Sequence, residues 1–491
     1  MNILMVYPEF PDTFWSFNHA LKFIRKKAFA PPLGLLTVAA MLPAAWEKRL
    51  VDLNVTRLTQ HDLDWADYVF VSAMIVQREA ARAVIDRCKE SGVPVVAGGP
   101  LFTSEHASFA KVVHLVLNEA EITLPLFLAD LERGTPQRVY MTPEFPDIRQ
   151  TPVPLWELAD LKQYASISLQ FSRGCPFDCD FCNITALLGR RPRTKTAGQI
   201  IAELDHIYTL GWRGPVFFVD DNFIGNKKQL KSEILPALIA WRQDKSGFRF
   251  STELSINLAD DEELMSMMVD AGFASVFVGI ETPDDESLAE CSKHQNRGRD
   301  LVESVRRMQR AGMQVQGGFI VGFDSDTPSI FQRQIEFIQK SGIVSAMVGL
   351  LQAFPGTQLY DRLKKEGRLV SELSGDNVDG STNILPKMNI DVLHNGYKNI
   401  LHQIYSPKLY YERIITFLRE YKAPKLRSHL DPQYLLALWR SVYQLGIRGA
   451  ERVHYWKLWL WTLIHKPRLF PQAIELAIYG YHFRRVCELN G

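Results

Sequence analysis

Short apolar runs alternate with helix-length amphipathic stretches along the first 130 residues of the chain. The apolar runs cover residues 3–7, 50–55, 68–72, 93–97 and 113–117. Strands that alternate with helices form βαβ units, whose strands lie side by side in a parallel sheet. The pattern predicts an α/β domain over residues 1–135 with a doubly wound, Rossmann-like sheet. Such sheets bind their ligands at the carboxyl ends of the strands.

A second alternation begins after residues 136–165, which are rich in proline and polar residues and are predicted to form a linker. Six β/α units predict a partial (β/α)6 barrel over residues 166–357, and barrels carry their function at the carboxyl ends of the strands. The remainder is helical and aromatic, which predicts a helical C-terminal domain over residues 358–491. The apolar runs of the barrel cover residues 167–171, 216–219, 249–253, 275–280, 314–321 and 346–352.

Composition favours an ordinary globular protein, with 46% hydrophobic and 23% charged residues. A formal net charge of +1 offers no overall basic field, so no nucleic-acid partner is expected. The first residues lack the basic flank and cleavage site of a signal peptide, and no apolar run reaches the roughly 18 residues of a spanning helix. We therefore expect a cytoplasmic protein.

Three of the six cysteines lie within eight positions, directly after the first predicted barrel strand: Cys175, Cys179 and Cys182. Thiolates bind zinc and iron–sulfur clusters. A structural zinc site needs four ligands, and the next histidine along the chain is His206. A four-iron cluster on three cysteines leaves one iron open to another ligand. We therefore expect a [4Fe-4S] cluster, with zinc as the alternative.

The CxxxCxxC spacing in QFSRGCPFDCDFCN resembles that of the radical S-adenosylmethionine (SAM) family. The resemblance implies that the open iron binds the amino and carboxylate groups of SAM, and that one electron cleaves SAM to a 5'-deoxyadenosyl radical. It also implies a flavodoxin- or ferredoxin-type electron donor. The SAM contacts expected beside the cysteines and at the following strand ends are Phe181, Asp220, Asp221, Asn222, Glu253, Glu281 and Gly322.

A sheet domain followed by such a barrel resembles the class of proteins whose first domain binds cobalamin (B12). The DxHxxG loop by which many cobalamin proteins supply a histidine to cobalt is absent, because residues 8–12 are PEFPD. We therefore expect cobalamin without a histidine on cobalt, its lower face covered by residues 74–78. A sheet that binds nothing is the alternative. The cobalamin contacts that the resemblance implies are Ser72, Gln77, Gly98, Gly99, Asn118 and Glu119.

The C-terminal part is basic and aromatic, with fourteen Lys and Arg against six Asp and Glu after residue 400. Basic aromatic helices either pack on a core or lie on an anionic membrane surface. The three-part arrangement, with FVDDNFIGNKK, FVGIETPD and GGFIVGFDSD, is similar to a family of cobalamin-dependent radical SAM proteins with a helical C-terminal domain, which includes the hopanoid C-2 methylases.

The resemblance implies a methyltransferase that acts on an unactivated carbon of a lipid, an isoprenoid or another secondary metabolite. A lipid substrate would be compatible with peripheral contact at the inner membrane. Two alternatives stay open: a radical SAM cyclase or oxidoreductase that transfers no methyl group, and a non-catalytic metal-cluster scaffold.

Overall fold

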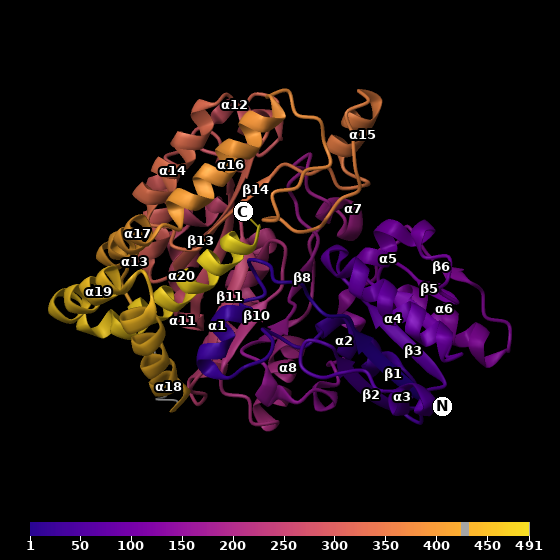
Figure 1. Cartoon of the computed structure of the whole chain (residues 1–491). Coiled ribbons are helices and arrows are strands. Elements are labelled where there is room, and N and C mark those ends of the chain that lie inside the picture. Colours follow the sequence, from indigo (N-terminus) through magenta and orange to yellow (C-terminus); the bar gives the residue numbers. More distant parts are fainter. Residues whose placement is uncertain (424–431, 491) are drawn as a thin grey trace.

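The computed structural model describes residues 1–423 and 432–490, without the side chains of residues 432, 433 and 490. Figure 1 shows three parts: an α/β layer at the right, a barrel in the middle and a group of helices at the left. The three parts follow one another along the sequence, as the periodicity predicts. The α/β class with a helical C-terminal region is confirmed.

The N-terminal sheet has six parallel strands in the order β2-β1-β3-β4-β5-β6. All five predicted strands are present, although β2 ends at Asp52 because its carbonyl accepts the hydrogen bonds of a turn from Val55 and Thr56. The sixth strand lies within the predicted linker and was missed because two residues show no periodicity. The strands are β1 (Asn2–Tyr7), β2 (Glu47–Asp52), β3 (Tyr68–Ser72), β4 (Val95–Gly98), β5 (His114–Val116) and β6 (Val139–Tyr140).

Alternate side chains of β1 supply the cores on the two faces of this sheet. Ile3 and Met5 pack with residues of α2 and α6, whereas Leu4 and Val6 pack with residues of α4 and α5. The order β2-β1-β3 reverses the direction of winding at β1, and the crevice at such a switch point is the usual ligand site. The helices are α2 (Leu33–Met41), α3 (Gln60–Trp65), α4 (Arg78–Glu90), α5 (Pro100–Glu105) and α6 (Ala120–Glu132).

The second sheet confirms all six predicted barrel strands, which are parallel and run in the order β14-β13-β12-β11-β10-β7. The first and last strands form the two edges, so the barrel is partial. The strands are β7 (Ile167–Leu169), β10 (Pro215–Phe218), β11 (Arg249–Leu254), β12 (Phe273–Glu281), β13 (Gln314–Val321) and β14 (Ala346–Leu350).

A small antiparallel hairpin, β8 (Ser172–Arg173) and β9 (Arg193–Thr194), brackets the cysteine loop just after β7. Helices cover the outer face of the barrel sheet and return the chain from one strand to the next. The helices from the hairpin onward are α7 (Ile184–Leu188), α8 (Ala197–Thr209), α9 (Lys227–Gln229), α10 (Leu235–Arg242), α11 (Glu262–Ala271), α12 (Asp285–Glu290), α13 (Leu301–Ala311), α14 (Ser329–Ser341) and α15 (Gln358–Lys365).

The C-terminal helices share one continuous core with the barrel. Ile400 and Phe417 are fully buried with Ile338 of α14, and the fully buried Arg413 donates hydrogen bonds to Gln339 and to the Ile404 carbonyl. The helices are α16 (Ile390–Ile404), α17 (Pro407–Glu420), α18 (Pro432–Ser441), η11 (Val442–Arg448), α19 (Arg452–His465), η12 (Pro467–Leu469) and α20 (Phe470–Asn490).

The segment that follows β1 leaves the N-terminal sheet and packs on the C-terminal helices. The ring of Phe14 stacks on Phe483 with centroids 4.1 Å apart, and Phe17 contacts Tyr479 and His482. The short helix α1 (Asn18–Leu21) therefore lies against α20. Part of the predicted first domain thus helps to build the third part of the molecule.

Within the residues that the structure describes, no helix is both long enough and apolar enough to cross a membrane.

Candidate functional site

The carboxyl ends of both parallel sheets face one cavity of about 2970 Å³. Single ligands of drug size occupy pockets of roughly 300–1,000 Å³, so the cavity has room for more than one ligand. It extends from Ser72 and Gly98 in the first part, past Asp221 and Glu253 at the strand ends of the barrel, to α18 at the far end. The geometry therefore brings together most of the strand ends that the sequence singled out.

The cysteine loop begins at Gly174, which has a φ of +92°. A Cβ atom there would lie 2.8 Å from the Gly189 carbonyl oxygen and 2.9 Å from that of Leu188. Burial raises the pKa of all three thiols, that of Cys182 to about 12. Metal ligation would hold them as thiolates.

Polar groups surround the sulfur atoms. Asn222 donates to Cys175 Sγ at 3.8 Å, and Gln295 donates to Cys179 Sγ at 3.7 Å. In the described parts of the chain, no three His, Cys, Asp or Glu side chains are grouped so as to hold one metal ion. Three thiols on one loop with amide donors beside them fit an anionic iron–sulfur cluster.

Replacing Gly174 with alanine is expected to disrupt this loop, because the added Cβ would meet backbone that cannot yield easily. Iron content after anaerobic purification should fall severalfold. Gly134 is a matched control, since it also has a positive φ (+74°) but open space around its Cα atom. Equal iron loss in Gly134→Ala and Gly174→Ala, or none in either variant, would contradict this account.

Lys293 lies beside the cysteines and was missed from the sequence, because it stands in a loop without periodicity. Its ammonium group donates to Glu281 Oε1 at 2.7 Å. Burial opposes the charge, but Glu281 and the Cys179 thiol together keep the pKa of Lys293 above its ordinary value. A buried cation here would stabilise the negative charge of thiolate ligands. Glu281, predicted as a SAM contact, is thus placed in an ion pair.

Asp220 is fully buried and anchors the first residues after β7. Its carboxyl group accepts hydrogen bonds from the backbone N–H groups of Phe171 (3.1 Å) and Ser172, and from the Ser172 hydroxyl (2.6 Å). Burial raises its pKa to about 7, against the effect of these hydrogen bonds. The geometry therefore supports a positioning role for Asp220, in which it orients the cysteine loop.

Asp221 and Glu253 face the cavity instead. Burial raises the pKa of Asp221 to about 6, and its Oδ2 atom has no hydrogen-bond partner among the described residues. Burial and the charge of Asp221 raise the pKa of Glu253 to about 8. Neither carboxyl group forms an ion pair with a described residue, so the two fit a positively charged ligand group.

The remaining predicted SAM contacts, Asn222, Phe181 and Gly322, are not among the residues that line the cavity. Asn222 accepts from Ser255 N at 3.2 Å, in addition to its contact with Cys175. Phe181 packs on the ring of Phe323, with centroids 6.4 Å apart. The Gly322 N–H donates to Asp326 at 2.8 Å. These residues shape the loops around the cysteines.

Five of the six predicted cobalamin contacts line the cavity, the exception being Gln77. The buried Gln77 amide donates to the Pro8 carbonyl at 2.6 Å and accepts from Met74 N at 2.8 Å, so it ties two loops together. At Gly98 and Gly99 a Cβ atom would lie 2.6 Å from the Val116 carbonyl oxygen and 2.4 Å from Ser72 Oγ, respectively. Glycines thus let three strand ends converge on the cavity.

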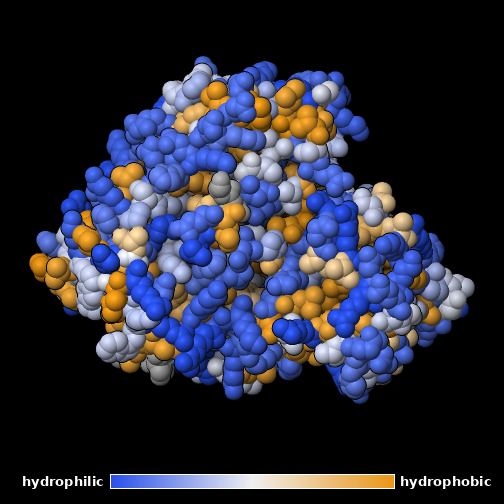
Figure 2. Space-filling model, in the orientation of Figure 1, coloured by the Kyte–Doolittle hydropathy of each residue, from blue (hydrophilic) through white to orange (hydrophobic). Residues whose placement is uncertain are grey.

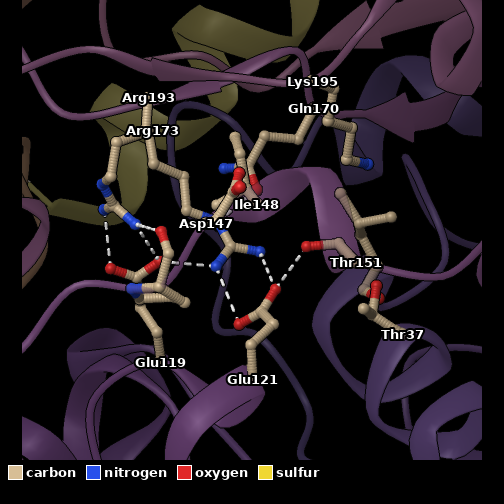
Figure 3. Close-up of polar contacts among 12 residues, drawn as sticks. Thr37, Glu119, Glu121, Asp147, Ile148, Thr151, Gln170, Arg173, Arg193 and Lys195 are labelled. Carbon is tan, nitrogen blue, oxygen red and sulfur yellow. Dashed lines mark hydrogen bonds and ion pairs between the residues drawn. The ribbon is translucent and has the colours of Figure 1, made fainter.

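Glu119 also lines the cavity, but its carboxylate is occupied by two arginines of the β8–β9 hairpin (Figure 3). Arg173 donates to Glu119 at 2.6 Å and to Glu121 at 2.9 Å, and Arg193 donates to Glu119 at 2.6 Å. Burial alone would raise the pKa of Glu121, but Arg173 holds it below the ordinary value. This network joins the N-terminal sheet domain to the barrel.

None of the described residues that line the cavity is a histidine. His19, the histidine nearest to the first loop in sequence, lies between Asp12 and His482 on the side of the C-terminal helices. Met74, Ile75 and Val76 do line the cavity. The other two residues of the predicted floor, Gln77 and Arg78, do not line the cavity, and Arg78 is paired with Glu105.

Family models match three consecutive stretches of the chain. The B12 binding domain matches residues 25–128, the radical SAM superfamily matches residues 169–338, and a domain of unknown function (DUF4070) matches residues 357–490.

Two curated relatives align over nearly the whole chain. An uncharacterized methyltransferase of Synechocystis sp. is 41% identical and covers 100% of this chain and 92% of its own length. The hopanoid C-2 methylase of Rhodopseudomonas palustris is 36% identical and covers 94% of this chain and 89% of its own length.

Two solved structures share the fold. The cobalamin-dependent SAM radical enzyme OxsB, with aqua-cobalamin bound, superimposes with a TM-score of 0.63 at 14% identity, over 99% of this chain and 83% of its own. The radical SAM methyltransferase TsrM from Kitasatospora setae, with cobalamin and a [4Fe-4S] cluster bound, gives 0.59 at 15% identity, over 76% of this chain and 79% of its own. The chain belongs to the family of B12-binding radical SAM methyltransferases that includes the hopanoid C-2 methylase.

Proposed function

We propose that this protein transfers a methyl group from SAM to an unactivated carbon of an apolar, isoprenoid-type substrate, with cobalamin as the intermediate carrier. One observation carries the proposal. A single cavity joins Asn183 and helix α7, which directly follow the three cysteines, to the ligand edge of the N-terminal sheet and to an aromatic wall inside the barrel, although the cysteine side chains are not among its lining residues. SAM, cobalamin and the substrate, between which the methyl group must pass, could therefore be bound in one continuous cavity.

The aromatic wall indicates the substrate class. Trp15 and Phe277 pack edge to face at 5.3 Å, and the Trp15 indole N–H lies 3.0 Å from Met347 Sδ. Phe29 and Phe217 extend the same lining of the cavity. Large aromatic and thioether groups favour a rigid hydrocarbon over a polar substrate. The hopanoid substrate named for one relative fits this description.

The chain offers each cofactor a separate set of residues. Cys175, Cys179 and Cys182 would hold the cluster. Asp221 and Glu253 would contact the positively charged amino acid end of SAM. Backbone and side chains at Ser72, Gly98, Gly99 and Asn118 would hold cobalamin, above a floor that includes Met74. When bound, these groups together supply a methyl group and a carbon radical that removes hydrogen from an unactivated carbon.

The protein's own contribution is positioning and enclosure. Asp220 orients the cysteine loop, and the Glu119–Arg173 network holds the ligand edge of the N-terminal sheet against the barrel. The aromatic wall excludes water and stray hydrogen donors from the space between them. No side chain needs to act as an acid or a base in this scheme.

Changing Glu253 to glutamine is expected to weaken SAM binding roughly tenfold, because a charge-assisted hydrogen bond to the ammonium group would be lost. A nearby cation favours the charged carboxylate, which offsets the raised pKa of Glu253 in the free protein. Equilibrium dialysis with labelled SAM measures the change. Glu233→Gln, on the outside of the barrel, is the control. Equal SAM affinities in both variants would remove Glu253 from the SAM site.

Three further parts of the proposal concern organisation and partners. The proposed domain boundaries are 1–135, 136–165, 166–357 and 358–491, with β6 of the linker returning to pair with β5 of the first domain. A flavodoxin- or ferredoxin-type protein would supply the electron. The protein would act in the cytoplasm, with peripheral contact at the inner membrane for a lipid substrate.

The proposal is tested by anaerobic incubation of the cluster- and cobalamin-loaded protein with SAM, a reductant and hopanoids. We expect 5'-deoxyadenosine and a methylated hopanoid. Formation of 5'-deoxyadenosine with an oxidised or cyclised product and no added methyl group would favour the alternative radical chemistry. Absence of 5'-deoxyadenosine under all conditions would favour the non-catalytic scaffold.

A further inference from the structure

The outer side of the C-terminal helices carries large apolar side chains that the protein core does not cover. We call this the C-terminal apolar surface. Trp439 is 73% exposed and Ile464 is 72% exposed. Figure 2 shows hydrophobic residues at the left edge of the molecule, where α19 lies in Figure 1. The surface consists of Leu435, Trp439, Tyr443, Ile447, Val453, Trp456, Leu460, Leu463 and Ile464.

Packing on the barrel accounts for only one side of these helices. Tyr455 and Leu458 of α19 are fully buried in the shared core, whereas Val453, Leu460 and Ile464 of the same helix point away from it. On α18, Leu435 and Trp439 are four residues apart and therefore lie on one face. The helices are thus apolar on a second side that has no partner within the described parts of the chain.

The exposed charges of residues 432–470, which carry this surface, have one sign. Residues 432–470 contain six Lys and Arg but a single acidic residue, Glu451. Glu451 is 5% exposed and is paired with Arg484. Arg448, Arg452, Lys457 and Arg468 are exposed. Within residues 432–470, apolar side chains and cations are exposed but the acidic side chain is not, a composition that matches an anionic lipid bilayer.

The cavity reaches the molecular surface at the same place. Leu435 of α18, Arg468 of η12 and Pro471 at the start of α20 line the cavity and are also exposed. We call the opening beside Leu435, Arg468 and Pro471 the lower mouth. It lies at the amino ends of the barrel strands, where Arg249, Gln314 and Glu475 also line the cavity. The side-chain amide nitrogen of the buried Gln314 has no hydrogen-bond partner among the described residues. It can therefore donate a hydrogen bond to a polar group of a ligand.

We propose that the C-terminal apolar surface docks on a bilayer that contains anionic lipid, and that the adjoining lower mouth takes up the substrate from that bilayer. The second half rests on the proposed function, because it requires a lipid substrate. An amphiphilic substrate would enter the barrel with its apolar end first, because the cavity lining is polar at Arg249 and Gln314 and aromatic at Trp15 and Phe277. Its polar end would then remain near Arg249 and Gln314, while its apolar end reaches the aromatic wall.

A second copy of the chain is a weaker candidate for the same surface. Two symmetric copies would bring the same cationic groups against each other, and like charges oppose such an interface. An anionic bilayer has the complementary sign and can bury apolar side chains of any arrangement. The charge pattern therefore favours lipid as the occupant.

The docking half is tested by sedimentation of the full-length, cluster-containing protein with vesicles of phosphatidylcholine alone or with phosphatidylglycerol. We expect binding only when phosphatidylglycerol is present, and weaker binding at high salt. The double variant Trp439→Ser and Ile464→Ser should bind at least about tenfold more weakly, since two exposed apolar side chains no longer enter the bilayer.

The matched control is Leu126→Ser with Met141→Ser, because these two residues are 53% and 58% exposed but lie in the N-terminal part. It should bind vesicles as the native protein does. Equal binding by both double variants, or no binding by the native protein, overturns the docking surface. So does a native dimer that the Trp439 and Ile464 changes dissociate while vesicle binding is absent.

The uptake half is tested with a hopanoid held in the same vesicles and with the same hopanoid in detergent. The Trp439 and Ile464 variant should methylate the vesicle-held substrate at least about tenfold more slowly and the detergent-held substrate at the native rate. Equal rates on vesicles overturn uptake from the bilayer. If the native protein binds vesicles and forms 5'-deoxyadenosine but methylates neither preparation, the proposed function fails and the docking surface stands.

Discussion

Replacing Cys179 with alanine is expected to reduce 5'-deoxyadenosine formation to an undetectable level and to lower the iron content of the anaerobically purified protein. Cys179 is one of three thiols on the loop between β8 and β9, and two cysteines cannot hold a cluster that leaves one iron open. The protein should stay folded, since the loop is also held by Asp220 and by the hairpin. Iron analysis and chromatography of the nucleoside measure the two effects.

Cys291 provides the control for this experiment. It is a buried thiol whose backbone carbonyl accepts from Asp180 N, so it lies close to the cysteine loop without belonging to the motif. Cys291→Ala should keep its iron and its activity. If Cys291→Ala loses iron as Cys179→Ala does, Cys291 is a fourth ligand and no iron corner remains for SAM. If Cys179→Ala keeps both iron and activity, the cluster assignment is wrong.

Replacing Arg173 with methionine is expected to destabilise the protein by about 3–5 kcal/mol, because it leaves buried carboxylates without a cation. The Glu119 and Glu121 side chains are only 6% and 7% exposed, and Arg193 can neutralise one of them. The N-terminal sheet domain would separate from the barrel at a lower denaturant concentration. Denaturant unfolding of the full chain, followed by intrinsic fluorescence, measures the loss.

Arg149→Met is the control, since the Arg149 side chain is 64% exposed and its pair with Asp147 lies in solvent. It should unfold at the native denaturant concentration. An Arg173→Met variant that unfolds with the control would show that the network does not hold the domains together. Glu119→Gln separates the two roles of Glu119, because a fall in cobalamin affinity without a fall in stability would favour a direct cobalamin contact.

The regular elements were predictable because the two periodicities differ clearly. Parallel strands buried on both faces appear as short apolar runs, and the intervening helices are amphipathic. The eleven strands expected from these runs are all present. The missed strands β6, β8 and β9 have two residues each, and the segment around Phe14 follows β1 in sequence but packs on α20. Neither feature produces a periodic pattern of apolar residues in the sequence, because tertiary contacts alone determine both.

The location of the candidate site could be predicted from the sequence, but the role of each residue in it could be predicted less well. Strand ends and the cysteine spacing indicated which loops face the cavity. The sequence does not show the direction of a side chain, so Asp220 and Asp221, which are adjacent, looked equivalent. Asp220 accepts hydrogen bonds from the residues after β7, whereas Asp221 faces the cavity. Arg173 was missed because its partners Glu119 and Glu121 come from the N-terminal sheet domain, and Lys293 was missed because its loop has no periodicity.

The central claim is that the methyl group of SAM ends on a carbon of an apolar substrate. The most direct test is an anaerobic reaction of the cobalamin-loaded protein with SAM that carries a deuterated methyl group, followed by mass spectrometry of the extracted hopanoid. The account predicts a product that retains the complete deuterated methyl group. A product formed without any deuterium, while SAM is consumed and 5'-deoxyadenosine accumulates, would contradict it.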